Sequence, residues 1–252
     1  MSEETHPAPV ARGRAGDRPR PGVAVLPPPA GRADGLVAAV TAGGARVTAP
    51  EEAGALVWTD HRDPQGLGRL LDAQPGLRWV QLPWAGIEPY VEVVAAHADR
   101  IWTCGKGVYA EPVAEHALAL ALAGLRGIDR FARARTWTSP RGHNLLGAEV
   151  AVVGGGGIAR SLLHLLEPFR CQVTVVRRSG APVPGAARVV GPEGLDSALA
   201  GARLAVLALP LVAATEGLVD ARRLALVGPD GCLVNVARGR HVVTDDLVAA
   251  LR

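Results

Sequence analysis

The 252-residue sequence lacks the patterns that mark secreted, membrane-spanning or metal-binding proteins. Its three cysteines are scattered and form no C-x-x-C pair, which argues against a disulfide framework and favours a reduced, cytoplasmic compartment. No apolar run reaches the length of a membrane span, and no pair of histidines has the spacing of a metal site. The net charge is only +3, so we expect neither a nucleic-acid nor a membrane partner.

The composition that remains is that of a globular protein. The sequence is 48% hydrophobic and 20% charged, and its length suits two modest domains. Residues 1–21 are rich in Pro, Gly, Arg and Ala and contain no hydrophobic signal core, so we predict a disordered tail there. We predict a first domain over residues 22–110 and a second over residues 111–252.

The segment from Glu149 to Ser179 has the pattern of a dinucleotide-binding βαβ unit. An apolar strand, a glycine turn, an apolar-faced helix and a second apolar strand follow one another, over residues 149–153, 154–157, 158–166 and 172–176. The second strand ends about twenty residues after the turn, as expected of such a unit. We therefore predict that this segment binds a dinucleotide cofactor.

The small residues of the turn form the signature G-x-G-x-x-A. Gly154 permits the tight turn, Gly156 lets the backbone approach a pyrophosphate, and Ala159 lets the helix pack on the strand. The helix begins at about Gly157, so free N–H groups at Gly157 and Ile158 and a partial positive charge point at the phosphates. Glycines also make plain turns, but a strand before the turn and a helix after it favour the cofactor.

The second strand ends in Arg177, Arg178 and Ser179, where an acidic residue would favour NAD. Two guanidinium groups and a hydroxyl suit a 2′-phosphate through charge-assisted hydrogen bonds. We therefore predict NADP(H) as the preferred cofactor and NAD(H) as the alternative. The competing interpretation is a pair of solvated surface arginines.

Strands alternate with helices in both domains, which predicts parallel sheets and the α/β class. In the first domain we expect strands at residues 23–26, 45–48, 55–58, 78–82 and 101–103, and helices at 33–42 and 67–73. In the second we expect further strands at 187–190, 203–209 and 232–237, and helices at 195–200, 221–226 and 245–251, the last capped by Thr244. The prediction is a Rossmann-type doubly wound parallel sheet plus a smaller flavodoxin-like α/β domain.

A long apolar helix is expected from Glu111 to about Arg130. Its apolar residues are Val113, Ala117, Leu118, Leu120, Leu122 and Leu125. They cover more than one face, which predicts burial between the domains or at a subunit interface.

Five motifs together resemble the D-isomer-specific 2-hydroxyacid dehydrogenases, in particular the glyoxylate/hydroxypyruvate reductases. Besides the glycine turn they are Leu82–Ile87, Gly107–His116, Leu207–Leu211 with Thr215–Leu218, and Asn235–Gly239, which has the form N-x-A-R-G. The resemblance covers roughly residues 22–252. It implies that the first domain binds the substrate and that the second binds the nicotinamide cofactor.

The resemblance implies a role for several residues in turn. Arg238 would grip the carboxylate and carbonyl of a 2-oxo acid, which a planar guanidinium can do; a lone arginine after a strand could equally form a surface salt bridge. The substrate would also contact the backbone of Ala85 and Gly86 and the wall formed by Trp84. The cofactor would contact Leu209, Pro210 and Thr215, and Val236 and Ala237 beside Arg238. For Leu209 and Val236 the alternative is plain sheet core, and for Trp84 it is packing.

In that family the general acid is a histidine oriented by a glutamate, and both lie downstream of the segment that matches Asp245–Leu251. We therefore expect the cofactor domain to be C-terminally incomplete and the proton donor to be missing, in a fragment or a shortened homologue. His241 follows Arg238 closely, but the resemblance does not make it the acid.

The function implied by the resemblance is NAD(P)-dependent reduction of a small 2-oxo acid, such as glyoxylate or hydroxypyruvate, to the D-2-hydroxy acid. A homodimer across the helix at 111–130 is expected. The alternative is a non-catalytic NAD(P)-sensing homologue that acts like a corepressor, and a third reading is a related oxidoreductase such as a formate dehydrogenase.

Overall fold

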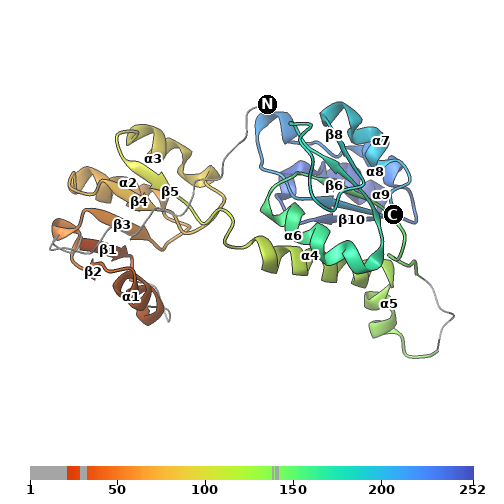
Figure 1. Ribbon diagram of the computed structural model, residues 1–252, viewed down its shortest axis with the longest axis horizontal. Coiled ribbons are helices and arrows are strands. Elements are labelled where there is room, and N and C mark those ends of the chain that lie inside the picture. The colour runs from red at the N-terminus through yellow and green to blue at the C-terminus, as the bar shows by residue number, and fades with distance from the viewer. Residues whose placement is uncertain (1–21, 29–32, 138, 140–141) are drawn as a thin grey trace. The chain divides into compact units, whose positions relative to one another are not determined.

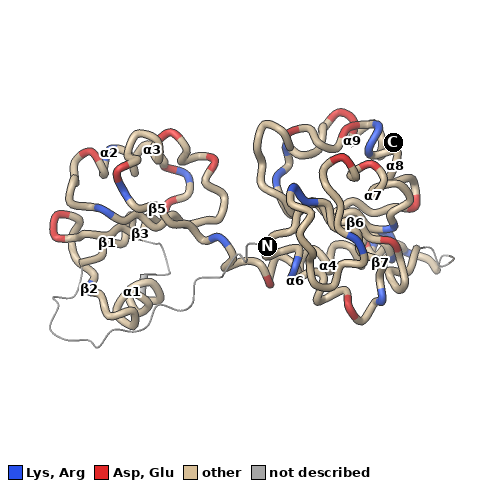
Figure 2. The backbone as a smooth tube through the Cα atoms, turned by 45° about the horizontal axis from the view of Figure 1, so that its top comes forward, with Lys and Arg blue, Asp and Glu red and all other residues tan. Residues whose placement is uncertain are grey.

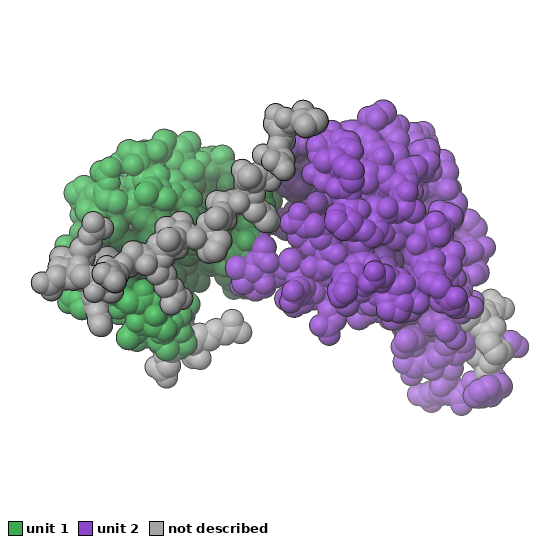
Figure 3. All heavy atoms as spheres, viewed as in Figure 1, with its two compact units in different colours: residues 1–106 green, residues 107–252 purple. Residues whose placement is uncertain are grey.

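The computed structural model describes residues 22–28, 33–137, 139 and 142–252 (Figure 1). The predicted disordered tail, residues 1–21, lies outside these ranges. The chain divides into two compact units, unit 1 up to Lys106 and unit 2 from Gly107 to Arg252 (Figure 3). Acidic and basic residues are interspersed along both units (Figure 2). In the described ranges, no helix combines the length and apolarity needed to cross a membrane.

Unit 1 contains a five-stranded parallel sheet in the order β2-β1-β3-β4-β5. The strands are β1 (Gly22–Leu26), β2 (Arg46–Val47), β3 (Ala55–Trp58), β4 (Trp79–Gln81) and β5 (Ile101–Thr103). The order 2-1-3-4-5 is that of flavodoxin-like folds, as predicted. The carboxyl ends of these strands therefore form one edge, where such sheets bind ligands.

The helices of unit 1 are α1 (Ala33–Ala42), α2 (Pro64–Ala73) and α3 (Val91–Ala96), with short 3₁₀ turns η1 (Pro50–Glu52) and η2 (Glu88–Tyr90). Helices α2 and α3 lie on one face of the sheet and α1 on the other (Figure 1). Leu67 and Leu71 of α2 are fully buried against the strands. Asp63 caps α2 by accepting a hydrogen bond from Gly66 N at 2.7 Å, so the helix begins at Pro64, three residues before the predicted start.

Unit 2 contains a second five-stranded parallel sheet, in the order β10-β9-β6-β7-β8. The strands are β6 (Glu149–Val153), β7 (Gln172–Val176), β8 (Arg188–Val190), β9 (Leu204–Leu207) and β10 (Cys232–Asn235). Read from β8 to β10, with the strands numbered 1 to 5 in their chain order within this unit, the order is 3-2-1-4-5. This is the order of a Rossmann-type sheet, as predicted. The chain runs from β6 outward to β8 and then returns to the other side of β6, so the strand order reverses between β6 and β9.

Helices cover both faces of this sheet. They are α4 (Ala110–Leu125), α5 (Ile128–Arg133), α6 (Gly157–Leu166), α7 (Leu195–Leu199), α8 (Ala221–Val227) and α9 (Thr244–Ala250), with 3₁₀ turns η3 (Glu167–Phe169), η4 (Pro192–Gly194), η5 (Ala213–Thr215) and η6 (Gly239–His241). Val150 and Val152 pack with α4 and α6, whereas Ala151 and Val153 pack with α7 and α8 on the opposite face. This alternation is the two-residue period of a strand buried on both sides.

The prediction of a single helix over residues 111–130 is wrong. Helix α4 ends at Leu125, and Gly127 adopts φ 61°, a left-handed conformation that stops one helix before α5 begins at Ile128. The buried stripe of α4, formed by Ala114, Ala117, Ala121 and Leu125, packs within unit 2 against α6 and β10. The proposed cap of the last helix is also wrong, because Val243 holds the N-cap position and Thr244 is the first helical residue.

Candidate functional site

The glycine turn joins β6 to α6 at the centre of the sheet of unit 2. Gly154 adopts φ 116°, and its N–H donates to the carbonyl of Val176 at 2.8 Å. A Cβ at this position would overlap the carbonyl oxygen of Ala208 and lie 3.1 Å from Leu209 N. The turn therefore packs directly on the end of β9, where the strand order reverses, and this conformation and approach require glycine.

The next part of the turn is open instead of packed. Gly156 is exposed, and no described atom lies within 4 Å of the place that a Cβ would occupy. Gly156 is also the N-cap of α6, and among the described residues no side chain caps its first turn. The N–H groups at the start of α6 can therefore bind an anion, and the open space above Gly156 suits a pyrophosphate.

Behind the turn, α6 is held close to its neighbours. A Cβ at Gly157 would lie 3.1 Å from Cβ of Ala110, at the start of α4. Ala159, Leu162 and Leu163 are buried against the sheet and α4. Gly157 and Ala159 thus allow the close packing that holds the start of α6 at the carboxyl edge. Ile158 is partly buried in the same cluster.

The end of β7 lies beside the glycine turn. The backbone N–H of Arg177 donates to Val190 at 3.0 Å, and its half-buried side chain lies over the turn. A Cβ at Gly155 would lie 2.9 Å from Cδ and 3.0 Å from Nε of Arg177. Arg178 and Ser179 follow as exposed residues. This places one guanidinium against the turn, with a second guanidinium and a hydroxyl next along the chain.

On the other side of β6, the loop after β9 begins with Leu209 and Pro210. Leu209 is partly buried and packs in the cluster of the α7 and α8 face, so its side chain contributes to the core. Thr215 Oγ1 accepts a hydrogen bond from Val212 N at 2.9 Å and lies 2.9 Å from Pro210 O. The hydroxyl group of Thr215 therefore closes this loop on itself.

The end of β10 carries Arg238 at the same edge of the sheet. The predicted strand at 232–237 ends early, at Asn235, because the side chain of Asn235 forms a turn: its Oδ1 accepts from Ala237 N at 3.0 Å and its Nδ2 donates to Arg238 O at 2.8 Å. Arg238 is exposed, and its Nη1 donates to Ala237 O at 2.9 Å. Val236 and Ala237 are partly buried, one on each face of the sheet.

His241 is a residue of this edge that sequence reasoning did not assign. Its side chain is fully buried, Nδ1 lies 2.8 Å from Thr215 O, and Nε2 lies 3.2 Å from Leu209 O. The sequence holds no signal for these contacts, because the partners are 26 and 32 positions away.

The predicted substrate residues Trp84, Ala85 and Gly86 belong to unit 1, where they follow β4 at the carboxyl edge of its sheet. Trp84 is 43% exposed, and its ring meets the ring of His61 edge-on at a centroid distance of 5.7 Å. Trp84 O accepts from Gly105 N at 3.3 Å. The loops after β3 and β4 thus lie together, as expected for neighbouring parallel strands.

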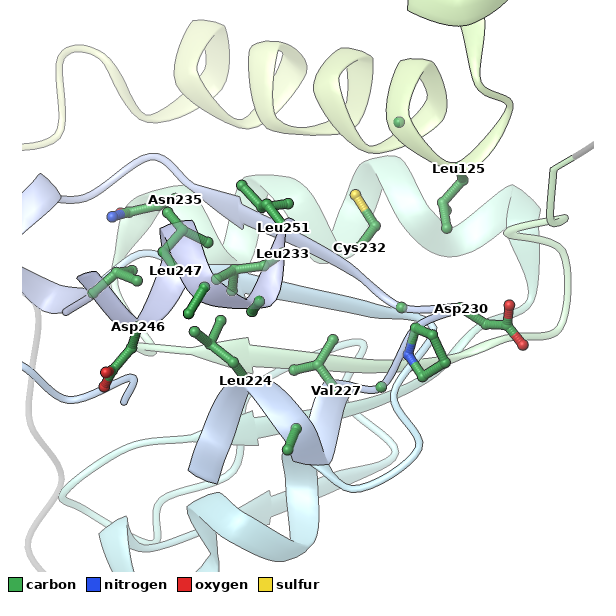
Figure 4. Close-up of a pocket in the computed structure, with 18 of the residues that line it drawn as sticks. Leu125, Leu224, Val227, Asp230, Cys232, Leu233, Asn235, Asp246, Leu247 and Leu251 are labelled. Atoms are coloured by element: carbon green, nitrogen blue, oxygen red, sulfur yellow. The ribbon is translucent and has the colours of Figure 1, made fainter. Parts of the chain in front are cut away.

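A groove of about 1400 Å³ runs along β10, away from the central strand (Figure 4). Its lining includes Leu125, Leu224, Val227, Cys232, Leu247 and Leu251. Burial raises the pKa of the Cys232 thiol, which keeps that side chain neutral and suits the apolar lining. Within the described parts of the chain, no three His, Cys, Asp or Glu side chains are placed to hold a metal ion.

Comparison with known proteins identifies relatives of this chain. Residues 116–252, more than half of the chain, match the family model described as D-isomer specific 2-hydroxyacid dehydrogenase, NAD binding domain. The chain is 35% identical over 186 residues to an uncharacterized protein in the proB 3′ region of Corynebacterium melassecola, covering 71% of this chain and 61% of that protein. It is 28% identical over 145 residues to the glyoxylate/hydroxypyruvate reductase A of Serratia proteamaculans, covering 56% of this chain and 46% of that protein.

The fold has solved counterparts. The crystal structure of a D-isomer specific 2-hydroxyacid dehydrogenase from Xanthobacter autotrophicus Py2, in complex with NADPH and MES, matches with a TM-score of 0.75 at 24% identity, covering 93% of this chain and 78% of that one. The matches to the two curated relatives span about half to three fifths of those proteins. From its family-model match and its two parallel-sheet units, the chain belongs to the D-isomer specific 2-hydroxyacid dehydrogenase family.

Proposed function

We propose that the protein binds NADP(H), in preference to NAD(H), across the carboxyl edge of unit 2, and that it reduces a small 2-oxo acid to the D-2-hydroxy acid. The observation that carries the proposal is the glycine turn. Its space at Gly156 is open, and the Arg177 side chain lies over the adjacent Gly155. Phosphate groups would fill that space, and Arg177 with Arg178 and Ser179 would bind the 2′-phosphate through charge-assisted hydrogen bonds.

Arg238 would hold the substrate. It is exposed at the end of β10, and the Asn235 turn fixes the backbone from which it projects. Its guanidinium can bind a carboxylate with two parallel hydrogen bonds and polarise the adjacent carbonyl. Arg238 would thus hold the carbonyl carbon ready to accept the hydride that NADPH supplies when bound, and the carbonyl oxygen would take its proton from solvent water to become the hydroxyl group.

The substrate class rests on similarity. The Serratia proteamaculans relative is named a glyoxylate/hydroxypyruvate reductase, so glyoxylate and hydroxypyruvate are the first substrates to test. In unit 1, the backbone of Ala85 and Gly86 would bind the substrate, and the side chain of Trp84 would form a wall of the substrate pocket. A homodimer and a cytoplasmic location stay predictions, and sedimentation equilibrium would test the first.

A second candidate is cofactor binding without turnover. The open space at Gly156 and the Arg177 side chain over Gly155, which support cofactor binding, also support this candidate. His241 follows Arg238 but is buried with both ring nitrogens against backbone carbonyls, so it is not placed to donate a proton to a substrate.

The test is an assay for oxidation of NADPH in the presence of glyoxylate or hydroxypyruvate, with chiral analysis of the product. The proposal expects consumption of NADPH with formation of the hydroxy acid, as the D isomer where the product is chiral. Tight NADPH binding with no turnover on either acid would move the second candidate ahead. No binding of either nicotinamide cofactor would refute both.

A further inference from the structure

The imidazole of His241 contacts both ends of one loop. Nδ1 lies 2.8 Å from the carbonyl oxygen of Thr215, and Nε2 lies 3.2 Å from that of Leu209. Leu209 and Thr215 are the first and last residues of the loop that follows β9 at the carboxyl edge of unit 2. His241 itself ends η6, three residues after Arg238. One buried side chain thus connects the loop after β9 to the segment after β10.

The backbone around His241 strengthens this connection. Gly217 N donates to Arg240 O at 2.8 Å, and Val219 N donates to His241 O at 2.8 Å. In addition to these backbone hydrogen bonds, Arg240 Nη2 lies 2.5 Å from Glu216 Oε1 in an exposed ion pair. The chain after Thr215 is therefore fixed to the segment that follows Arg238. The imidazole extends that attachment back to Leu209, where the loop begins.

The chemistry of the contact makes the side chain hard to replace. Both partners of the ring are carbonyl oxygens, which can only accept. A neutral imidazole donates to one of them, and an imidazolium donates to both. In a buried site a carbonyl that loses its donor stays desolvated and unpaired, so the loop would move to find another partner.

The place of this loop follows from the strand order. A dinucleotide on such a sheet has its pyrophosphate over the glycine turn after β6 and its adenosine ribose at the end of β7. Its other half then extends to the opposite side of β6, where β9 ends. We propose that His241 is a positioning residue that holds the loop from Leu209 to Thr215 in the form that receives the nicotinamide half of the cofactor. This inference rests on the proposed function.

The test compares two ligands that share the adenosine half. NADPH reaches both sides of β6, whereas adenosine 2′,5′-bisphosphate occupies only the β7 side. In His241→Phe, we expect the dissociation constant of NADPH to rise about five- to tenfold and that of the bisphosphate to stay within about twofold. His241→Gln, which keeps an N–H donor, is measured beside it in case the aromatic variant does not fold. In this variant too we expect the dissociation constant of NADPH to rise, by a smaller factor, and that of the bisphosphate to stay unchanged.

The control is Val227→Ala, because Val227 is buried in α8 on the same face of the sheet but lies outside the loop. It should lower the melting temperature and leave both dissociation constants unchanged when they are measured well below that temperature. Equal weakening of both ligands by the His241 variants, or no weakening of either, would overturn the positioning role while wild-type protein still binds NADPH. Wild-type protein that binds neither ligand would overturn the proposed function and this inference with it.

Discussion

At the scale of single residues, two glycines of one turn are needed for different reasons. The folded backbone itself requires glycine at position 154, because Gly154 has a φ of 116° and its packing on Ala208 leaves no room for a Cβ. Gly156 has room for a Cβ in the protein alone. Its hydrogen is needed only when a ligand fills the space beside it. Stability and binding should therefore separate between the two positions.

We expect Gly154→Ala to lower stability by about 2 kcal/mol or more, because it adds both backbone strain and a steric overlap. We expect Gly156→Ala to melt close to wild type and to bind NADPH at least about tenfold more weakly. Thermal unfolding and fluorescence titration measure the two effects. A Gly156→Ala protein that binds NADPH as tightly as wild type would show that the pyrophosphate lies elsewhere.

Arg177 should set the choice between the two cofactors. Removing a charge-assisted hydrogen bond to a phosphate costs about 1.5–3 kcal/mol, so Arg177→Ala should weaken NADPH binding about tenfold or more and change NADH binding little. Arg188→Ala is the matched control. Val190, at the end of β8, accepts the hydrogen bond from Arg177 N, whereas Arg188 stands at the start of β8, at the opposite end of that strand. Equal loss for both cofactors would argue against a 2′-phosphate contact.

Arg238 should matter through its shape as well as its charge. Arg238→Lys keeps the charge but loses the planar pair of donors, so we expect a higher KM for the 2-oxo acid and a kcat lower by about tenfold or more. Arg188→Lys is the control, since Arg188 is exposed at the start of β8 and has no part in the proposed substrate site. Steady-state kinetics with glyoxylate give both constants. Unchanged kinetics in Arg238→Lys would remove the residue from the substrate site.

At the scale of elements, helices α7 and α8 are joined by one carboxylate. Asp196 accepts hydrogen bonds from Arg222 Nη1 at 2.6 Å and from Arg223 Nε at 2.8 Å. These bonds lower the pKa of Asp196 to about 2, from an ordinary value of 3.8. The folded protein therefore binds this proton more weakly than the unfolded chain does.

The consequence for stability has a definite sign. The contribution of Asp196 is complete above its unfolded pKa of 3.8 and is lost as the pH falls toward 2. We expect Asp196→Asn to be less stable than wild type at pH 5 and to lose less stability between pH 4 and pH 2. Urea unfolding at a series of pH values measures this. Parallel curves for the two proteins would mean that the carboxylate is not held in this way.

The elements that the sequence predicts well are those whose signal is local. The strands β3, β5, β6 and β7 have the predicted bounds, because each is a short apolar run between turn residues. The break at Gly127 was missed because apolar residues continue beyond it, and only the left-handed φ separates α4 from α5. Helix α3 was missed because it has only 6 residues, follows η2 directly and, among the described residues, has no side-chain cap to mark its start.

The same distinction holds for the candidate site. The glycine turn and the arginines after β7 stand in one continuous segment, so their nearness follows from the sequence. The contacts of His241 with Leu209 and Thr215 join residues 32 and 26 positions apart, and a single sequence does not predict contacts over such separations. The packing of Gly154 on Ala208 is likewise a product of the strand order.

At the scale of the whole molecule, each unit has one edge at which its parallel strands end, and the candidate residues lie on these edges. Unit 2 carries the glycine turn, Arg177 and Arg238, and unit 1 carries Trp84, Ala85 and Gly86. The proposed function assigns the cofactor to the edge of unit 2 and backbone contacts with the small acid to the edge of unit 1.

The most direct measurement is the pair of dissociation constants of wild-type protein for NADPH and NADH, determined by fluorescence titration under one set of conditions. We expect saturable binding of both cofactors, with NADPH bound at least about tenfold more tightly through its 2′-phosphate. Tighter binding of NADH would contradict the role given to Arg177, Arg178 and Ser179. Binding of neither would contradict the assignment of the glycine turn as a cofactor site.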